Sequence, residues 1–264
     1  MDMRIYTVDS FTDQFFKGNP AGVCLLDNPA PDAWMQALAA EMRHSETAFL
    51  LGGEAGEPYS LRWFTPATEV ALCGHATLAT AHVLYSTGTA PETLKFATKS
   101  GILAVTRDET GLITMDFPAK PLEETDPPEG LTEALGVTPR WAGRNVWDYL
   151  VEVESEDAVR AVSPDFPALA AVDARGVIVT APSARPGVDY VSRFFAPRVG
   201  VPEDPVTGSA HCALAPYWTA KLGPATLLGE QLSERGGTIR TTVRGDRVEL
   251  SGRAVTVLSG ELHA

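Results

Sequence analysis

The sequence predicts an α+β fold of two pseudo-symmetric lobes, each a curled, mostly antiparallel sheet around a central buried helix. An internal repeat is the first observation: Phe64-Thr65-Pro66 precedes Gly74-His-Ala-Thr-Leu-Ala-Thr-Ala, and Phe195-Ala196-Pro197 precedes Gly208-Ser-Ala-His-Cys-Ala-Leu-Ala. The two glycines are 208 minus 74, or 134, positions apart in 264 residues, which indicates a duplicated unit. Both alanine-rich stretches are apolar nearly all round and are flanked by strand patterns, so each predicts a buried helix wrapped by strands.

Apolar alternation and turn residues predict the elements of the first half in order. They are strands at 3–9 and 21–26, a helix from Pro31 to about His44, strands at 46–51 and 59–64, the first repeat helix from Gly74 to a cap at Gly88, and strands at 92–98, 101–107 and 112–117. Trp34, Leu38 and Met42 recur at fourfold spacing, which predicts that they share one face of the 31–44 helix.

The second half repeats the mixture after a segment rich in proline and acidic residues at 119–130, which we interpret as a linker. Strands are expected near 149–153, 176–180 and 189–195, the second repeat helix at 208–222 with Gly223 as its cap, and strands near 238–243, 247–251 and 254–258. The predicted N-terminal lobe is therefore 1–118, with a strand from 253–264 as its candidate completion, and the C-terminal lobe is 131–252.

Composition and motifs exclude several classes of function. A net charge of −13 argues against a nucleic-acid partner. No run of about 20 apolar residues and no signal peptide is present, so the expected location is cytoplasmic. Three distant cysteines support neither a disulfide framework nor a zinc site. Histidine ligand spacing, phosphate-binding glycine loops and a Gly-x-Ser-x-Gly elbow are all missing, so no metal or cofactor is expected.

The two repeat glycines each mark the expected first turn of a helix. Free N–H groups at a helix start bind anions, and His75 and Ser209 occupy corresponding places after Gly74 and Gly208. If a pseudo-dyad relates the lobes, both starts face the cleft between them. A small carboxylate substrate fits that arrangement.

Five short motifs, in order along the chain, resemble the phenazine-biosynthesis isomerase family, the PhzF-like proteins. They are Gly-Asn-Pro-Ala-Gly-Val at 18–23, Ser-Glu-Thr-Ala-Phe at 45–49, Phe-Thr-Pro at 64–66, Cys-Gly-His-Ala-Thr at 73–77 and Glu-Asp-Pro-Val-Thr-Gly-Ser-Ala at 203–210. The resemblance implies the diaminopimelate-epimerase fold, a homodimer, and proton transfer without cofactor or metal. It does not identify the substrate.

The resemblance also implies roles for individual residues. The residue matching Glu46 is the family's catalytic acid/base. Residues matching Ser45, Gly74, His75, Asp204, Gly208 and Ser209 contact the substrate. On the residues alone, Glu46 precedes the apolar run Ala48 to Leu51, so partial burial would raise its pKa toward neutrality; the alternative is a strand-end glutamate in water.

The remaining site residues also have structural alternatives. Asp204 could be a turn former, but it stands about a turn before the helix, which favours orienting or sharing a proton with the substrate or His75. His75 could cap its own helix, or, held neutral by the helix's positive end, pass a proton. Ser209 is a common N-cap residue, and this is compatible with substrate contact.

Cys73 supports a second mechanism. Amino-acid epimerases of the same fold use two cysteines on opposite faces of the substrate, and Cys73 falls where the first would be. Its partner in the repeat is Thr207, and Cys212 lies inside the helix, so half of that machinery is missing; both thiols can also be small buried hydrophobes.

A third alternative is an inactive metabolite-binding or protein-interaction module on the same fold. The loops expected to select the substrate are 52–58 and 141–148.

Overall fold

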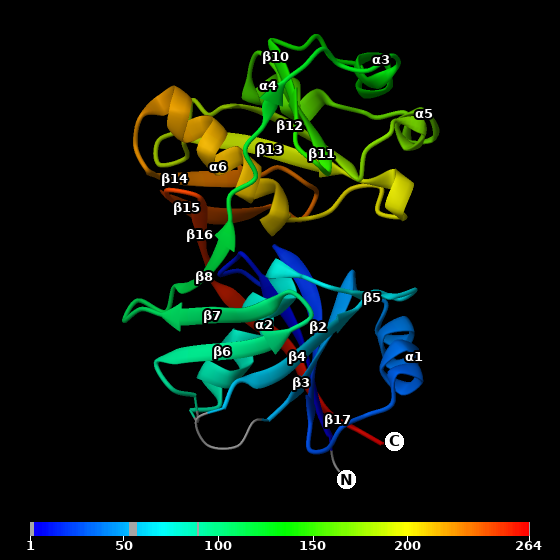
Figure 1. Cartoon of the computed structure of the whole chain (residues 1–264), viewed down its shortest axis with the longest axis vertical. Coiled ribbons are helices and arrows are strands. Elements are labelled where there is room, and N and C mark those ends of the chain that lie inside the picture. Colours follow the sequence, from blue (N-terminus) through cyan, green and yellow to red (C-terminus); the bar gives the residue numbers. More distant parts are fainter. Residues whose placement is uncertain (1–2, 53–56, 89, 264) are drawn as a thin grey trace. The chain divides into compact units, whose positions relative to one another are not determined.

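The computed structural model describes residues 3–52, 57–88 and 90–263 of the chain. The chain forms two compact units (Figure 1): the first is Met1–Asp116 with Ser251–Ala264, and the second is Phe117–Leu250. Of the loop 52–58, which the sequence predicts to select the substrate, positions 53–56 lie outside the described residues. No helix in the described ranges is both long enough and apolar enough to cross a bilayer.

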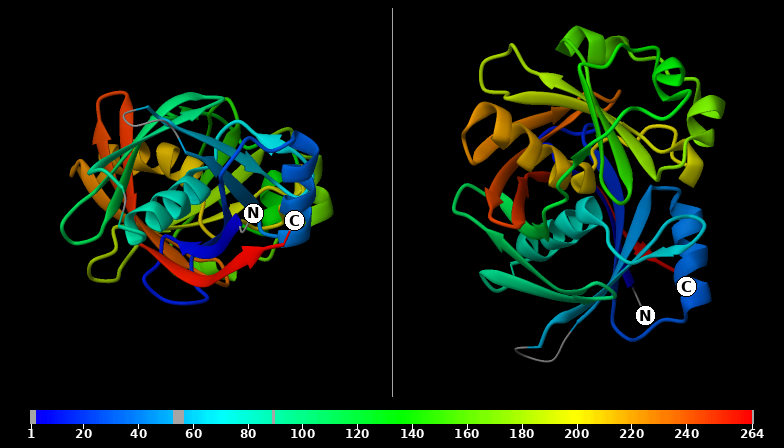
Figure 2. Two further views of the ribbon diagram at one scale, coloured as in Figure 1. Left: turned by 90° about the horizontal axis from the view of Figure 1, so that it is seen from below. Right: turned by 45° about the horizontal axis from the view of Figure 1, so that its top comes forward.

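The first unit is a sheet around one buried helix. Its elements are β1 (Met3–Ser10), β2 (Asn19–Leu26), α1 (Asp32–Met42), β3 (Glu46–Leu51), β4 (Tyr59–Phe64), β5 (Glu69–Val70), α2 (Gly74–Ser86), β6 (Thr93–Thr98), β7 (Gly101–Arg107), β8 (Ile113–Pro118) and β17 (Ala254–Leu262). The strand order is β17-β1-β2-β3-β4-β6-β7-β8; the pairs β2/β3 and β4/β6 are parallel, and the other neighbouring pairs of this order in the described ranges are antiparallel. Figure 2 shows β17 beside β1.

Helix α2 forms the centre of this unit. Ten of its residues are buried, and it contacts β1, β2, β3 and β17. A helix with no polar face gains most by being surrounded on all sides, which is why the sheet curls around it. Helix α1 instead covers β3 and β4 with Met35 and Ala39, which are buried, while Trp34 and Leu38 are only partly buried beside them. The apolar face of α1 is thus rotated slightly from the predicted one.

The second unit has the same plan. Its elements are β9 (Glu123–Glu124), α3 (Leu131–Leu135), β10 (Trp141–Arg144), β11 (Asp148–Glu152), α4 (Glu156–Ala161), α5 (Phe166–Ala171), β12 (Gly176–Pro182), β13 (Tyr190–Phe195), the 3₁₀ turn η1 (Pro197–Val199), α6 (Gly208–Leu222), β14 (Thr226–Gln231), β15 (Gly237–Arg244) and β16 (Arg247–Gly252). The strand order is β9-β10-β11-β12-β13-β14-β15-β16, and the parallel pairs are β11/β12 and β13/β14.

The two units therefore match strand for strand. Starting from the second strand in each strand order, the pairs are antiparallel, parallel, antiparallel and parallel in both units. In both units the buried helix follows the first strand of the second parallel pair along the chain and precedes the second strand. Helix α6 is buried on nearly all sides, as α2 is, and contacts β14 and β15. The predicted fold class, two like-built α+β lobes each around a buried helix, is confirmed.

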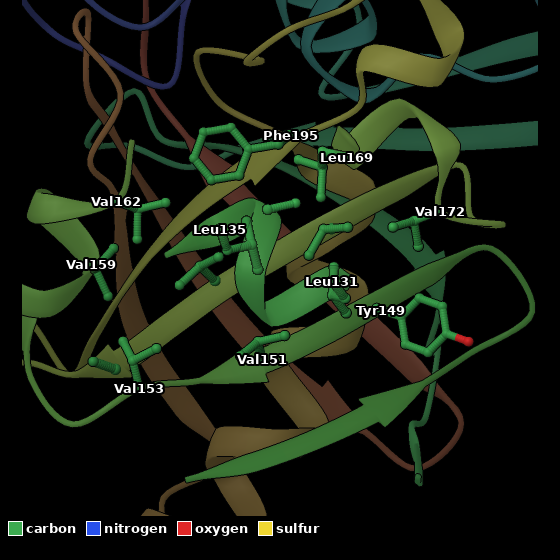
Figure 3. Close-up of a cluster of buried hydrophobic side chains, with 14 of the residues drawn as sticks. Leu131, Leu135, Tyr149, Val151, Val153, Val159, Val162, Leu169, Val172 and Phe195 are labelled. Atoms are coloured by element: carbon green, nitrogen blue, oxygen red, sulfur yellow. The ribbon is translucent and has the colours of Figure 1, made fainter. Parts of the chain in front are cut away.

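The second unit also has a core on the other side of its sheet, away from α6. Apolar side chains of β11, β12 and β13 pack there against the short helices α3, α4 and α5 (Figure 3). Leu131, Leu135, Val159 and Leu169 supply the helical side of this core and are almost fully buried. The sequence did not predict these helices, because five or six residues are too few to show a periodic pattern.

The segment 119–130, interpreted above as a linker, lies in the second unit and is hydrogen-bonded to it. The Ala119 amide donates to the Asp246 carbonyl, and the Lys120 amide donates to the Cys212 carbonyl at 2.9 Å. Pro216 explains the second bond. A proline inside a helix has no N–H, so the carbonyl four residues earlier, that of Cys212, loses its helical donor, and the Lys120 amide replaces it.

Candidate functional site

In the first unit, Glu46 and His75 lie together. Glu46 begins β3, and His75 is in the first turn of α2, which contacts that strand. His75 Nε2 lies 3.3 Å from Glu46 Oε2, within ion-pair range, although the ring N–H is not aligned with the carboxylate as a hydrogen bond requires. The side chain of Glu46 is 19% exposed and that of His75 is 7% exposed, so the carboxylate still reaches solvent while the imidazole is covered.

His75 is neutral at physiological pH. Burial, followed by the nearby His44, lowers the pKa of its imidazole to about 3. The other ring nitrogen, Nδ1, lies 3.5 Å from the Cys73 thiol. With Glu46 ionised, the favoured tautomer places the single ring proton on Nε2, facing the carboxylate, so that Nδ1 accepts from the thiol S–H. The three side chains can therefore hold or relay a proton without any of them leaving its place.

Two motifs of the sequence hold this cluster in position. Gly18 has a φ of 67°, and a Cβ there would lie 2.1 Å from the Ser10 carbonyl oxygen, so only glycine fits. Ser10 in turn donates from its hydroxyl to the His75 carbonyl at 2.7 Å. Ser45 contacts the fully buried Asn19 through an Oγ to Oδ1 distance of 3.4 Å. The Gly-Asn-Pro motif thus fixes both the chain before Glu46 and the start of α2.

In the second unit, Asp204 belongs to a hydrogen-bonded loop before α6. Its carboxylate accepts from the Thr207 hydroxyl at 2.5 Å, and Thr207 is the N-cap residue of α6. Gln231, fully buried on β14, ties the loop down: its amide group donates to the Asp204 carbonyl and accepts from the Thr207 amide. Asp204 is therefore held rigidly, about one turn ahead of Gly208.

Ser209, the repeat partner of His75, contacts an arginine that the sequence did not indicate. Arg175 Nη2 donates to Ser209 Oγ at 3.0 Å. The guanidinium is held from behind by Asp148, which is 1% exposed and accepts from Nε at 2.9 Å and from Nη2 at 2.5 Å. Such a bidentate pair gives the guanidinium a fixed orientation.

The starts of α2 and α6 are alike in another respect. Their N-cap residues, Cys73 and Thr207, make no side-chain cap hydrogen bond, and neither helix has an acidic residue in its first turn. The N–H groups of both first turns therefore donate no hydrogen bond to the side chain of their own N-cap residue, and free N–H groups at a helix start are suited to an anion. The carbonyls of these N-cap residues do have side-chain partners, four residues further along each helix. The Thr77 hydroxyl donates to the Cys73 carbonyl, and His211 Nδ1 donates to the Thr207 carbonyl.

Among the described residues, one group has the donor types of a metal site. Ligand atoms of Glu46, Cys73 and His75 all lie within 4.8 Å of one another. The carboxylate, however, faces Nε2 and the thiol faces Nδ1, which point away from each other across the ring. An ion bound to Nε2 would lie on the side of Glu46 and away from the Cys73 thiol, and an ion bound to Nδ1 would lie on the side of Cys73 and away from Glu46. The arrangement therefore suits the sharing of a proton better than the coordination of a metal.

The structure thus brings the sequence-predicted residues together in two sets. Ser45, Glu46, Gly74 and His75 form the first set, in the first unit, and Asp204, Gly208 and Ser209 form the second set, in the second unit. Sequence reasoning missed Arg175, Asp148 and Gln231. The strand pairings reveal the first of these: Arg175 directly precedes β12 as Ser45 directly precedes β3.

Comparisons with known proteins give a consistent result. The family model described as "Phenazine biosynthesis-like protein" matches residues 8–260. A Halalkalibacterium halodurans protein named as an uncharacterized isomerase is 50% identical over 265 residues, 99% of each chain. A crystal structure of a PhzF-family phenazine biosynthesis protein from Enterococcus faecalis superimposes with a TM-score of 0.95 at 43% identity, covering both chains fully.

A more distant likeness concerns the fold alone. A hydroxyproline epimerase from Agrobacterium vitis has a TM-score of 0.61 at 13% identity, over 98% of this chain and 90% of that one. The epimerase-type fold expected from the sequence motifs is therefore confirmed.

Proposed function

The chain belongs to the phenazine biosynthesis-like (PhzF) family of isomerases, and from this premise we propose that it moves a proton between two carbons of a small carboxylate substrate without metal or cofactor. The substrate class is an amino- or hydroxy-substituted acid. The observation that carries the proposal is the Glu46 carboxylate, partly exposed and 3.3 Å from the buried, neutral imidazole of His75.

In this mechanism Glu46 is the acid/base. It takes a proton from one carbon of the substrate and returns it to another. A carboxylate that is four-fifths covered but still reaches solvent has little hydration to lose when substrate arrives, which favours proton transfer. Before the transfer, the Nε2–H group of neutral His75 stabilises the negative charge of the Glu46 carboxylate. After Glu46 has taken the proton and is neutral, the neutral imidazole is still compatible with it. A protonated imidazole would instead lock Glu46 in its ionised form.

The other residues bind and orient the substrate. Ser45 and the first-turn amides at Gly74 and Gly208 hold the carboxylate and polar groups, each helix start contributing about 0.3–2 kcal/mol. Asp204 and Ser209 act on the same substrate, with Asp204 handling the second site of protonation. We propose that the protein acts as a homodimer, as the family resemblance implies, and that it is cytoplasmic, as expected from its sequence.

The test is proton exchange with solvent. Small unsaturated amino and hydroxy acids are incubated one at a time with the protein in deuterated water, and deuterium in the acid is followed by mass spectrometry. We expect exchange into at least one acid, and Glu46→Gln to slow it by about a hundredfold or more, since general acid–base catalysis is worth about 10²–10⁴. Glu41→Gln, on the exposed side of α1, is the matched control.

Exchange within about threefold of the original rate in Glu46→Gln would exclude this residue as the acid/base. Binding of an acid without any exchange in the unaltered protein would support the metabolite-binding module instead.

A thiol-dependent epimerase is the second candidate, because the Cys73 thiol lies beside His75. Cys73 is 6% exposed, its counterpart Thr207 is no thiol, and Cys212 is buried inside α6. We therefore expect Cys73→Ala to slow exchange by no more than about threefold, because the thiol only orients the imidazole. Complete loss of exchange in this variant, with Glu46→Gln still active, would favour the epimerase.

A further inference from the structure

The matching strand orders of the two units identify a counterpart for the Glu46 region in the second unit. In the first unit, β3 begins at Glu46, which pairs with Ala21 of β2; in the second, β12 begins at Gly176, which pairs with Asp148 of β11. Each strand is the second member of the first parallel pair of its unit. The residue before each strand, Ser45 or Arg175, therefore occupies the same place in the two folds.

Each of these strand starts lies beside the start of its unit's buried helix. In the first unit the contact is between Glu46 and His75, at 3.3 Å. In the second unit it is between Arg175 and Ser209, at 3.0 Å, and Ser209 is the residue that the repeat matches to His75. The duplication thus preserves one junction, but with a carboxylate and imidazole in one copy and a guanidinium and hydroxyl in the other.

The contact with Arg175 decides how Ser209 can hydrogen-bond. A hydroxyl has one proton to donate and two lone pairs, and a guanidinium can only donate. Because Ser209 Oγ accepts from Arg175, its own proton is left to donate, and no residue in the described part of the chain accepts it. Arg175 itself cannot turn away, since the almost fully buried Asp148 accepts two hydrogen bonds from it.

The surroundings of Arg175 are cationic and aromatic, although the whole chain has a net charge of −13. The guanidinium lies against the rings of Trp147 and Phe194, with centroid distances of 5.3 and 5.6 Å. Lys120 Nζ lies 4.2 Å from the same Trp147 ring. The side chain of Arg175 is 35% exposed and the residue Trp147 is 38% exposed, so both are open to a ligand.

We propose that Arg175 is a positioning residue that fixes Ser209 as a hydrogen-bond donor to the carboxylate of the substrate, so that the second unit recognises the anionic end. This inference rests on the proposed function for the identity of the substrate. The buried Asp148 neutralises much of the arginine's charge, so Arg175 acts mainly by orienting the hydroxyl. The uncapped first turn of α6 supplies the neighbouring N–H groups.

Benzoate and its neutral isostere benzamide are the probes, and calorimetric titration of the full-length protein gives both dissociation constants. We expect the unaltered protein to bind benzoate at least about tenfold more tightly than benzamide. Arg175→Gln and Ser209→Ala should each remove most of that preference, and the double variant should lose no more than either single variant. Arg175→Lys should restore part of it.

Arg193→Gln is the matched control. Arg193 makes the same kind of bidentate pair in the same unit, but with Glu203, and it also donates to the Val162 carbonyl. Its replacement should leave the preference for benzoate intact. Thermal unfolding of every variant checks that it is folded, and Ser209→Ala, which leaves the Arg175–Asp148 pair in place, keeps the test valid if Arg175→Gln is unstable.

The proposal is overturned if the unaltered protein shows no preference for benzoate, if Ser209→Ala keeps the preference within twofold, or if the losses in the double variant add. Glu46→Gln separates this result from the proposed function. It should slow deuterium exchange by about a hundredfold or more and keep the benzoate preference; if exchange stays within about threefold of the original rate, the proposed function fails while the recognition by Arg175 still stands.

Discussion

The first unit has a carboxylate where its third strand begins, whereas the second unit has a glycine at that position and a guanidinium one residue earlier. Glu46 and Gly176 hold the same place in the strand order, yet only one of them can react. A side chain at position 176 is prevented by Phe194, because a Cβ there would lie 2.3 Å from its ring.

The difference teaches how one junction can serve two purposes. Both copies bring the start of a strand to the start of a buried helix whose N–H groups are uncapped. The first copy adds a carboxylate and an imidazole, Glu46 and His75, which can carry a proton, and the second adds a guanidinium and a hydroxyl, Arg175 and Ser209. We infer that duplication provided two anion-binding helix starts and that only the one in the first unit gained the glutamate and histidine pair.

The largest expected effect comes from removing the imidazole that distinguishes the first copy. His75→Gln should lower the rate of deuterium exchange at saturating substrate by about a hundredfold, because Glu46 loses the neutral group facing it. Its KM should change little. Steady-state kinetics measures the two constants separately, with His82→Gln as the control, since His82 is on the same helix but contacts Thr256.

Ser209→Ala should show the opposite pattern, a raised KM with the maximal rate kept within about threefold. If His75→Gln and Ser209→Ala change the same constant, the division of labour between the two copies is wrong.

The next effect is on stability and concerns the glycine that replaces the carboxylate. Gly176→Ala should lower the free energy of unfolding by about 1–3 kcal/mol, because the new methyl group overlaps the Phe194 ring. Urea unfolding measures this. Gly260→Ala, in β17 with nothing within 4 Å of its Cβ, should change stability by less than about 0.5 kcal/mol. Equal stability of the two variants would mean that Phe194 does not exclude a side chain there.

The smallest expected effect is on the pH dependence of stability, and it concerns His211, the buried histidine of α6. Burial lowers the pKa of His211 to about 4, and its Nδ1 donates to the Thr207 carbonyl. The unfolded chain, with a pKa near 6.5, binds this proton first, so His211 lowers stability as pH falls from about 6.5 to 4, by at most about 1.4 kcal/mol per pH unit.

His211→Gln should therefore flatten the decline of unfolding free energy between pH 7 and 5 in urea titrations. His263→Gln, which changes an exposed residue, should leave it as it is. A slope that His211→Gln does not alter would show that His211 is not the group responsible.

Much of the fold could be predicted from the sequence because its patterns are local and long. The strands at 46–51, 59–64 and 101–107 and the helix at 208–222 have the predicted bounds, and the repeat located both buried helices. Strand β14 was missed, as were the three short helices, whose positions depend on the core that they cover. The 119–130 segment was taken for a linker because composition does not reveal the backbone hydrogen bonds of Ala119 and Lys120 or the packing of Leu122 against the core of the second unit.

The candidate site was predictable where a motif marks it and not where only geometry does. Glu46, His75, Asp204 and Ser209 stand in recognisable strings. Arg175 does not, and the repeat is out of step there: the strand starts at 46 and 176 differ by 130 positions, but the helix starts differ by 134. Only the strand pairings align the two copies correctly.

Pro216 makes the buried helix of the second unit incomplete by itself. Its missing N–H leaves the Cys212 carbonyl dependent on an amide that the chain supplies ninety-two positions earlier, at Lys120. A helix that lacks one internal hydrogen bond is less able to form alone. Because the amide that replaces this bond comes from a distant segment, α6 gains it only when that segment packs against the helix. The segment entering the second unit and the helix bearing Ser209 are thereby expected to order cooperatively, in a single folding event.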